Sequence, residues 1–175
     1  MNYTIKDNYL EEEYFFSLQT YLLDPNFSRF PWIWSKIILN NEDKYNFQLV
    51  HVFYLVASGE GIGTTSPQLN ILAPLLTKLN PKALLRIKAN LNPCTDKIIE
   101  HTFHTDPPFL PNTDSFDCLT SIFYINTNNG HTKFEDGTVV DSVQNRLLTF
   151  PSNTKHTGTT CTDEPHRIVI NINYL

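Results

Sequence analysis

Two residues with metal-binding side chains, His104 and Asp106, stand two positions apart at the end of a stretch with strand-like composition. In a β-strand, residues i and i+2 project from the same face, so both side chains can point into one cavity while Thr105 points away. An imidazole and a carboxylate placed in this way can occupy neighbouring positions around a metal ion. The pair alone is weak support, because a strand-end histidine and a turn-forming aspartate before Pro107 would produce the same pattern.

Two further residues downstream give this pair a context. His156 follows Asp106 by 50 residues and comes after the apolar run 147–150, and Arg167 follows His156 by 11 residues. A second histidine would complete a 2-His-1-carboxylate triad, which leaves positions open on a bound Fe(II) ion, although the same ligands suit Zn(II), Mn(II) and Co(II). Arg167 begins the expected strand 167–173 and is followed by three apolar residues, so a guanidinium buried there would need a partner.

Taken in order, these four residues resemble the motif of the Fe(II)/2-oxoglutarate-dependent oxygenases, specifically their prolyl-4-hydroxylase-like branch, and the resemblance covers roughly residues 84–173. It implies that His104, Asp106 and His156 bind Fe(II). It also implies that the planar guanidinium of Arg167 binds the distal carboxylate of 2-oxoglutarate, whose keto acid end chelates the iron. The implied reaction consumes O2, hydroxylates a substrate C–H bond and releases succinate and CO2, with ascorbate as a candidate reductant.

Two more positions acquire roles through the same resemblance. Tyr124 lies in the expected strand 118–126, which resembles the Y-L-N strand of prolyl hydroxylases. This implies that the Tyr124 hydroxyl also binds the far carboxylate of 2-oxoglutarate. Asn171 shares the face of Arg167 by strand alternation and stands at a polar position where relatives can carry a hydroxyl.

Two flanking segments also resemble the family, and a third departs from it. Residues 130–134 resemble its G-x-T-x-F hairpin, and residues 145–150 resemble its N-R-L-x-x-F strand, in which Arg146 would have a structural role. The tyrosine that usually precedes the H-x-D pair has no counterpart, and Arg86 and Asn90 stand in that strand instead. Substrate recognition is therefore open on this side of the site.

Four other histidines compete with His156 for the third ligand position. We expect His101, three residues before His104, to lie on the opposite face of the strand. For the other three we expect surface positions or hydrogen bonds within the core: His51, His131 and His166.

Hydrophobic periodicity divides the chain into a helical first half and a β-rich second half. Apolar residues recur at helical spacing over residues 10–22, after a predicted capping box of Asn8 and Glu11. A second helix is expected over residues 66–79, with proline at its first position and an interruption at Pro74. Strands are expected at 45–57, 84–91, 98–104, 118–126, 132–135, 138–142, 147–150 and 167–173, with hairpin turns at 129–130 and 136–137.

This order of elements predicts a mainly β, α+β protein of one domain, residues 1–175. We expect a double-stranded β-helix core (jelly-roll, cupin-like) over residues 82–175, covered by a helical and aromatic layer over residues 1–80. The aromatic run 27–34 is expected to cover the core, the alternative being that Trp32 or Trp34 walls a substrate cleft.

Composition limits the class of protein and its partners. The 175 residues are 41% hydrophobic and 13% aromatic, which is typical of a globular domain. A net charge of −5 without a basic cluster argues against extended nucleic-acid binding, and no stretch resembles a signal peptide or a membrane span. Cys94, Cys118 and Cys161 are widely spaced, which indicates reduced thiols and a cytoplasmic location. We expect a small-molecule or peptide partner besides O2, and the oligomeric state stays open.

The sequence therefore predicts an Fe(II)- and 2-oxoglutarate-dependent dioxygenase acting on an unidentified substrate. Peptidyl or free proline is modestly favoured by the prolyl-hydroxylase-like motifs, but a shared fold does not identify a substrate. Two other interpretations stay open. One is a non-catalytic jelly-roll binding module; the other is a cupin-type metalloenzyme that does not use 2-oxoglutarate, in which Arg167 would have no link to a co-substrate.

Overall fold

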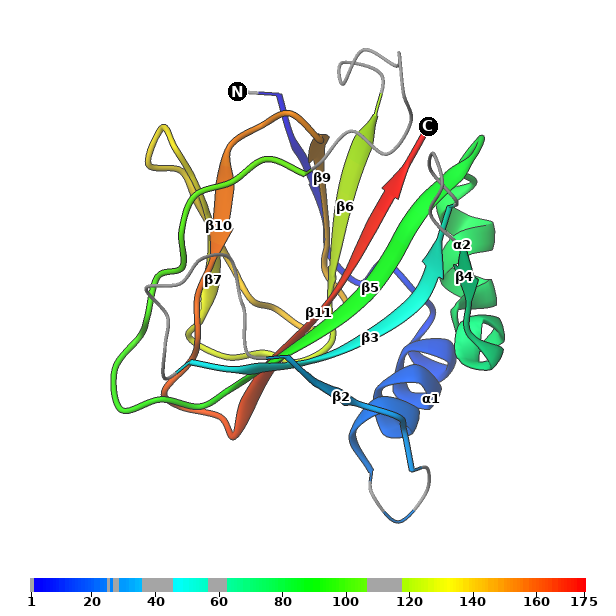
Figure 1. Ribbon diagram of the computed structural model, residues 1–175, viewed down its shortest axis with the longest axis horizontal. Coiled ribbons are helices and arrows are strands. Elements are labelled where there is room, and N and C mark those ends of the chain that lie inside the picture. The colour runs from blue at the N-terminus through cyan, green and yellow to red at the C-terminus, as the bar shows by residue number, and fades with distance from the viewer. Residues whose placement is uncertain (1, 25, 27–28, 36–45, 57–62, 107–117) are drawn as a thin grey trace.

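Two antiparallel β-sheets make up most of the computed structural model, which describes residues 2–24, 26, 29–35, 46–56, 63–106 and 118–175. The larger sheet has the strand order β1-β9-β6-β11-β5-β3-β2, with β4 paired to β3, and the smaller has the order β10-β7-β8. Figure 1 shows the small sheet facing the large one, with the helices on the far side of the large sheet. The strands are β1 (Thr4–Lys6), β2 (Ile33–Ser35), β3 (Gln48–Leu55), β4 (Thr64–Thr65), β5 (Leu84–Pro93), β6 (Leu119–Tyr124), β7 (His131–Phe134), β8 (Val139–Asp141), β9 (Leu147–Pro151), β10 (His156–Gly158) and β11 (His166–Tyr174).

The helical segments come from the N-terminal half of the chain, as predicted. They are α1 (Glu12–Leu23), the 3-10 helix η1 (Pro67–Leu72) and α2 (Ala73–Leu79). The predicted N-cap at Ser66 is confirmed, because its side chain accepts a hydrogen bond from the backbone N–H of Gln68. The predicted interruption is also confirmed: 3-10 geometry gives way to α geometry beside Pro74, which has no N–H to donate.

The predicted capping box at the start of α1 is wrong. Asn8 has a positive φ of 50°, and Glu11 stands at the N-cap without a side-chain hydrogen bond. Instead, the side chain of Asn145 accepts a hydrogen bond from Leu10 N at 2.8 Å and donates one to Leu10 O at 2.9 Å. A contact from a distant part of the chain therefore fixes the segment before the helix, where the local sequence suggested a cap.

The two faces of the large sheet differ: the face toward the helices is apolar, and the face toward the small sheet is mixed. Alternate residues of β5 and β11, such as Ile87 and Ile170, belong to the main hydrophobic core together with Leu18 of α1 and Leu75 of α2. The intervening residues of each strand project from the opposite face, toward the small sheet. The helices thus bury the outer face. Between the two sheets lies a second hydrophobic cluster, which includes Ile122 and Phe134, and the polar residues of β5 face the same interior.

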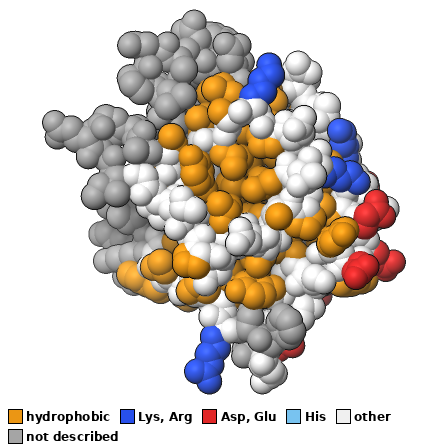
Figure 2. All heavy atoms as spheres, turned by 90° about the vertical axis from the view of Figure 1, so that its right-hand side faces the viewer, with side chains coloured by type: hydrophobic (Ala, Val, Ile, Leu, Met, Phe, Trp, Pro, Cys, Tyr) orange, Lys and Arg blue, Asp and Glu red, His pale blue; other side chains and the backbone are white. Residues whose placement is uncertain are grey.

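The outer side of the helical layer carries further hydrophobic side chains, which Figure 2 shows gathered on one face. Tyr14 and Phe16 of α1 are 52% and 46% exposed there. No helix in the described ranges combines the length and the apolar character needed to cross a bilayer. All three cysteines lie in the described part of the chain, and each is a free thiol.

The segment 98–104 is not the regular strand that the sequence suggests. It makes two isolated bridges to the neighbouring chain: Glu100 with Thr159 and His104 with His156. From Glu100 to His104 the segment advances by four residues, while its partner advances by three, from His156 to Thr159. The segment therefore contains one extra residue, as in a β-bulge. Because the alternation is broken, His101 lines the same cavity as His104, and its expected place on the opposite face is wrong.

One of the two predicted hairpins is confirmed and the other is wrong. The turn at 136–137 joins β7 to β8, and Gly137 has the positive φ of 89° that such turns require. The turn at 129–130 instead lies on the connection from β6 in the large sheet to β7 in the small sheet. Gly130 lacks a positive φ; it is needed there because the side chain of Arg167 approaches it closely.

Candidate metal centre

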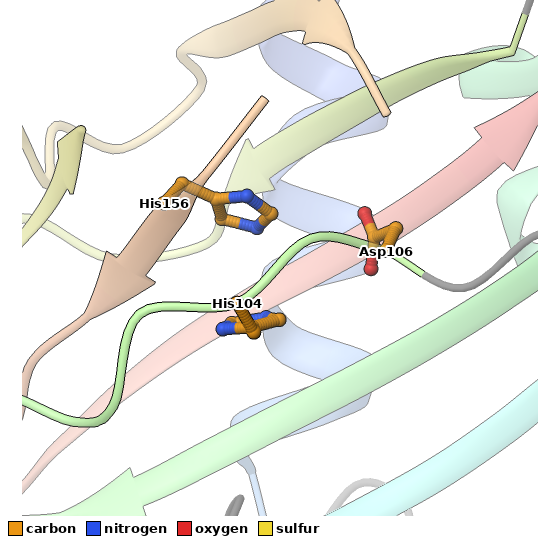
Figure 3. A group of neighbouring side chains, drawn as sticks. All are labelled: His104, Asp106 and His156. Carbon is orange, nitrogen blue, oxygen red and sulfur yellow. The ribbon is translucent and has the colours of Figure 1, made fainter. Parts of the chain in front are cut away.

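Three side chains with metal-ligand chemistry come together where the segment 98–106 runs beside β10. His104 and Asp106 come from this segment, and His156 is the first residue of β10. Backbone hydrogen bonds of 3.0 and 2.9 Å between His104 and His156 join the two elements. One ligand atom from each of the three residues lies within 4.8 Å of the others, and Figure 3 shows the side chains around a common space. The structure thus brings together the three residues that the sequence suggested.

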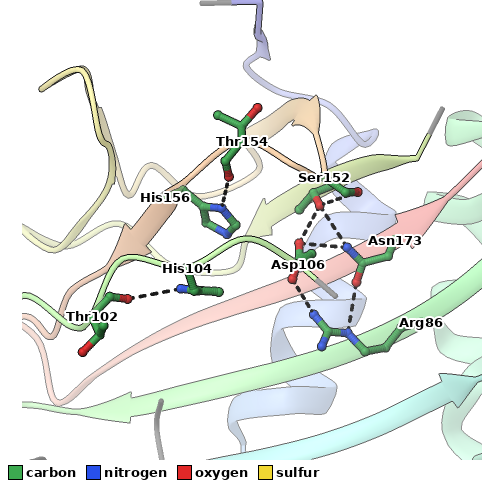
Figure 4. A network of polar contacts seen from close by, with 9 residues as sticks. Arg86, Thr102, His104, Asp106, Ser152, Thr154, His156 and Asn173 are labelled. Atoms are coloured by element: carbon green, nitrogen blue, oxygen red, sulfur yellow. Dashed lines mark hydrogen bonds and ion pairs between the residues drawn. The ribbon is translucent and has the colours of Figure 1, made fainter. Parts of the chain in front are cut away.

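Both imidazoles are held by backbone carbonyl groups (Figure 4). His104 Nδ1 lies 3.2 Å from Thr102 O, and His156 Nδ1 lies 2.9 Å from Thr154 O. In the tautomer that makes these bonds, Nδ1 carries the proton and donates, so Nε2 keeps the lone pair that can bind a metal ion. Burial, and then the neighbouring His104, lowers the pKa of His156 below its ordinary 6.5, which favours the neutral form that a metal ion needs.

The carboxylate of Asp106 receives hydrogen bonds from three side chains. Arg86 Nη2 donates to Oδ1 at 2.9 Å. Thr120 Oγ1 and Asn173 Nδ2 donate to Oδ2 at 2.5 and 2.9 Å. Burial by itself would raise the pKa of Asp106, but Arg86, His156 and these hydrogen bonds together hold it below its ordinary value. The group is therefore an ionised carboxylate.

The donor set fits a divalent transition-metal ion. Two imidazoles and one carboxylate suit Fe(II), and they suit Zn(II), Mn(II) and Co(II) as well. Each ligand is also oriented through its far side, the histidines by carbonyl oxygens and Asp106 by side-chain donors. Such outer contacts fix the direction and basicity of metal ligands in known metal sites.

A polar cavity of about 320 Å³ lies beside the three side chains. This volume is at the lower end of the range of about 300–1,000 Å³ that is typical of small-molecule pockets. Within the part of the chain that the structure describes, only Ile122 and Val169 contribute large apolar side chains to its wall. The polar wall comes in large part from alternate residues of β5: Arg86, Lys88, Asn90 and Asn92.

Arg167 lines the same cavity and is 2% exposed. Its Nε donates to Ser142 Oγ at 2.7 Å, and its Nη2 donates to Thr132 Oγ1 at 3.2 Å. No carboxylate among the described residues forms an ion pair with it. Burial, the largest influence, lowers the pKa of this guanidinium, as expected for a cation that has lost water without gaining an anion. Arg167 can therefore accept an anionic group that enters the cavity.

Tyr124 is fully buried against Arg167 and Thr132. Its hydroxyl donates to Thr132 Oγ1 at 2.8 Å, and Arg167 Cζ lies 5.7 Å from the centre of its ring. Thr132 and Arg167 line the cavity, whereas Tyr124 stands behind them. A direct contact between the Tyr124 hydroxyl and a co-substrate stays a prediction.

Two buried amide oxygens in the cavity wall, Asn171 Oδ1 and Asn92 Oδ1, have no hydrogen-bond partner within the described ranges. In the register of β5 and β11, Asn171 stands beside Lys88, and Asn92 stands beside Arg167. Buried polar atoms are nearly always hydrogen-bonded, so unpaired ones indicate a ligand or an ordered water molecule. The predicted placement of Asn171 on the face of Arg167 agrees with this arrangement.

Several other candidates from the sequence lie outside the cavity. His51 is a core histidine, as expected, because its ring nitrogens lie 3.0 Å from Pro31 O and 2.9 Å from Ser66 Oγ. Trp32 packs against the main core, and Trp34 is 59% exposed on the edge strand β2. Neither tryptophan lines the cavity, so neither walls a cleft at this site.

Of the histidines that compete with His156, only His101 reaches the cavity. His131 and His166 lie at the starts of β7 and β11 and do not belong to the cluster of ligand atoms. Sequence reasoning missed Lys88, Asn92 and Gln48 as lining residues. A signal for Lys88 was present, because strand alternation places it on the same face as Arg86 and Asn90, whereas Asn92 lies just beyond the expected strand 84–91.

The sequence matches no protein-family model and no curated protein sequence at a significant level. Solved structures do resemble the chain. A prolyl hydroxylase from Trichoplax adhaerens, in complex with a peptide of the oxygen degradation domain of hypoxia inducible factor, superimposes with a TM-score of 0.61 at 15% identity, over 99% of this chain and 83% of that one. The viral collagen prolyl hydroxylase of Paramecium Bursaria Chlorella virus-1, solved with 2-oxoglutarate, gives 0.61 at 11% identity, over 99% and 96%. The alpha ketoglutarate dependent carbocyclase SnoK of nogalamycin biosynthesis gives 0.67 at 13% identity, over 98% and 78%.

The fold is that of the 2-oxoglutarate/Fe(II) oxygenases. This confirms the double-stranded β-helix expected from the sequence. Prolyl hydroxylases are among the similar structures, in line with the motifs, although at 11–15% identity the likeness is one of fold.

Proposed function

We propose that this protein is an oxygenase that uses Fe(II), 2-oxoglutarate and O2 to hydroxylate a C–H bond of its substrate. His104, Asp106 and His156 would hold the iron, and Arg167 would bind the distal carboxylate of 2-oxoglutarate. One observation carries the proposal. One cavity is lined both by three clustered side chains with metal-ligand chemistry and by a buried arginine that has no carboxylate partner among the described residues. The fold of 2-oxoglutarate/Fe(II) oxygenases supports it.

The bound iron and 2-oxoglutarate would supply the oxidising chemistry, with succinate and CO2 as by-products. The protein would supply position and electrostatics. The carbonyl groups of Thr102 and Thr154 hold both imidazoles with Nε2 free, and Arg86 holds one oxygen of Asp106. At the other end of the co-substrate, Arg167 offers a planar pair of donors to a carboxylate, which fixes both its distance and its orientation. The two sheets would flank this chemistry on both sides.

The two rival interpretations explain less of the cavity. A non-catalytic binding module has no need for three ligand atoms within 4.8 Å of one another. A cupin-type metalloenzyme without 2-oxoglutarate would use the three ligands but would leave the buried Arg167 without an anion. Burying an uncompensated guanidinium is costly, so a recurring anionic ligand is the simpler explanation.

Proline, free or within a peptide, is the first substrate to test. The sequence motifs resemble those of prolyl hydroxylases, and two of the similar structures are prolyl hydroxylases. A carbocyclase shares the fold, however, so the fold does not decide the substrate. The three free thiols agree with a reducing compartment such as the cytoplasm, and ascorbate belongs in the assay as a candidate reductant.

Binding and turnover together test the proposal. We expect calorimetric titration under anaerobic conditions to detect 2-oxoglutarate binding by the iron-loaded protein and much weaker binding by the metal-free protein. Glutarate has the same two carboxylates but no keto group, so its binding should not respond to the metal. Succinate formation should then rise when a substrate is added. Metal binding without any 2-oxoglutarate binding would favour the cupin-type enzyme, and the absence of both would favour a binding module.

A further inference from the structure

Lys88 is the third cation in the cavity wall, and it differs from the other two. Arg86 is paired with Asp106 at 2.9 Å, and Arg167 donates to Ser142 at 2.7 Å. The side-chain amine of Lys88 makes no hydrogen bond or ion pair with any residue that the structure describes, although the side chain lines the cavity. Its charged end is therefore available to a ligand.

The surroundings of Lys88 are polar and enclosed. Strand register places it on β5 between Asn171 of β11 and Val52 of β3. Further along the same wall, the amides of Asn90 and Gln48 are 8% and 5% exposed. These side chains form a polar surface beside the metal ligands. Neither the iron nor the distal carboxylate of 2-oxoglutarate has a use for this surface.

The charge balance of the cavity calls for another anion. Three cationic side chains line the cavity, and among its described lining residues Asp106 is the single carboxylate. A divalent metal ion adds further positive charge. Under the proposed function 2-oxoglutarate brings two carboxylates, but one meets Arg167 and the other meets the metal. Lys88 is left for a third negatively charged group.

The state of the Lys88 amine agrees with this role. Burial, and then the neighbouring Arg86, lowers its pKa to about 8, while Asp106 opposes the shift. The amine is thus mostly protonated at neutral pH, but its charge is poorly compensated. An anion beside it would stabilise the charged form and would be held by a charge-assisted hydrogen bond.

We propose that the substrate is a small polar molecule with a carboxylate or phosphate group, and that Lys88 binds this group while Asn90 and Gln48 bind its other polar atoms. The inference rests on the proposed function, which assigns both carboxylates of 2-oxoglutarate to other partners. It favours free proline or another small acid over a peptidyl residue, whose backbone carries no charge at this point. Two unpaired buried oxygens, on Asn92 and Asn171, add acceptors for an N–H or O–H of such a molecule.

Nuclear magnetic resonance of the lysine side chains tests the anion site without turnover. Protein with ¹³C at lysine Cε is loaded with Zn(II), saturated with 2-oxoglutarate and titrated with sodium acetate, sodium phosphate or, as the ionic-strength control, sodium chloride. The signal of Lys88 is identified by its loss in Lys88→Met, and exposed Lys97 is the internal reference. Acetate or phosphate should shift the Lys88 signal saturably, and the more effective anion identifies the chemical group. If neither anion acts more strongly than chloride, the proposal is overturned.

The affinity for 2-oxoglutarate tests whether Lys88 binds the co-substrate instead of another anion. Lys88→Met should leave the 2-oxoglutarate dissociation constant within about a factor of three of the wild-type value, as should the control Lys97→Met. A loss as large as that expected for Arg167→Ala would assign Lys88 to the co-substrate and overturn the proposal. If the wild type binds no 2-oxoglutarate at all, the proposed function fails. The anion site is then judged separately from the same titration of the Zn(II)-loaded protein alone.

Matched substrates extend the test to catalysis. L-proline and L-prolinamide differ in the carboxylate, and the acid should stimulate succinate formation while the amide should not. For any acid that does so, Lys88→Met should raise KM by about 10- to 100-fold, the effect of one hydrogen bond to a charged group. Equal stimulation by an acid and its amide would contradict the proposal.

Discussion

Gly130 lies so close to Arg167 that a Cβ atom at position 130 would stand 2.6 Å from Arg167 Cδ and 2.6 Å from the carbonyl oxygen of Thr160. No real Cβ contact is that short, so the lack of a side chain at Gly130 is what allows the connection from β6 to β7 to pack on the arginine. The position of the guanidinium in the cavity therefore depends on a residue that has no functional group of its own.

Gly130→Ala tests this dependence. The added methyl group must displace Arg167 or the backbone at Thr160, and overpacking of this kind costs about 1–3 kcal/mol in the free energy of unfolding. The affinity for 2-oxoglutarate should fall as well, because the guanidinium moves. Urea unfolding and calorimetric titration measure the two effects. In the control Gly158→Ala, the new Cβ would lie 3.4 Å from Arg167 Nη1, an ordinary contact, so its loss of stability should be smaller. Equal effects of the two changes would argue against the packing explanation.

Much of the site could be predicted because its signals are local. His104 and Asp106 are two residues apart, and the strands that carry Tyr124, Arg167 and Asn171 show clear alternation. Hydrophobic periodicity likewise identified both helices and most strands, since it records which face of each element is buried.

The remainder depends on contacts between distant residues, which periodicity does not record. Asn145 is hydrogen-bonded to the backbone of Leu10, 135 positions away in the sequence. This contact, and not the predicted capping box of Asn8 and Glu11, fixes the start of α1. Arg86 of β5 reaches Asp106 in the segment 98–106, which runs beside β10, and no single segment of the sequence encodes that proximity. The extra residue in the segment 98–104 also could not be predicted, because a bulge is defined by how a segment pairs with its partner strand.

Removal of any one metal ligand should abolish tight binding of Fe(II). His104→Ala, Asp106→Ala and His156→Ala each leave two ligands, which rarely hold the ion in such a site. Metal content after dialysis, and the visible spectrum of the Co(II)-loaded protein, measure the loss. His131→Ala is the matched control, since His131 lies outside the cluster and should keep full metal occupancy. Full occupancy in His156→Ala would show that another residue is the third ligand.

The ion pair between Arg86 and Asp106 should influence how stability depends on pH. The pKa of Asp106 is lowered in the folded protein, so the unfolded chain takes up a proton first as the pH falls. The stabilisation from this group is therefore complete above the ordinary pKa of 3.8 and is lost as the pH falls through the lowered value. In metal-free protein, the free energy of unfolding should decline over this acid range.

Arg86→Met should change both the stability and this pH dependence. It leaves Asp106 buried without its cation, and breaking a buried pair in this way costs about 3–5 kcal/mol at neutral pH. Burial then dominates and raises the pKa of Asp106 relative to the wild type, so the acid loss due to this group should shrink or reverse. Urea unfolding of the metal-free proteins at several pH values between neutral and acid measures both effects. Parallel pH profiles of wild type and Arg86→Met would contradict the assignment.

Leu18 should matter for stability and not for chemistry. It is 4% exposed in the main core, on the face of the large sheet opposite the cavity. Leu18→Ala should lower the free energy of unfolding by about 2–5 kcal/mol, the cost of a cavity in a packed core. The folded variant should bind 2-oxoglutarate like the wild type. Tyr14→Ala, on the exposed side of the same helix, is the control and should cost about 0.5 kcal/mol or less. A large change in affinity with unchanged stability would contradict this division of roles.

Arg167 should determine the affinity for 2-oxoglutarate. The distal carboxylate loses water when it enters the cavity and needs a charged hydrogen-bond donor there. Removing one partner of such a pair costs about 2–5 kcal/mol, which corresponds to a rise of roughly 30- to 5,000-fold in the dissociation constant for Arg167→Ala. Iron binding should survive, because Arg167 is not a ligand. Anaerobic calorimetric titration of the metal-loaded variants measures this directly.

Two milder changes separate charge from geometry at the same point. Arg167→Lys keeps the positive charge but loses the planar pair of donors, so its loss of affinity should be smaller than that of alanine. Tyr124→Phe removes the hydrogen bond of 2.8 Å that orients Thr132 Oγ1. It should weaken 2-oxoglutarate binding by about 0.5–1.5 kcal/mol, the usual worth of one hydrogen bond. A greater loss in Tyr124→Phe would instead indicate that its hydroxyl touches the co-substrate. If wild type and Arg167→Ala bind 2-oxoglutarate equally well, the anion does not lie at Arg167, and the proposed function loses the observation on which it depends.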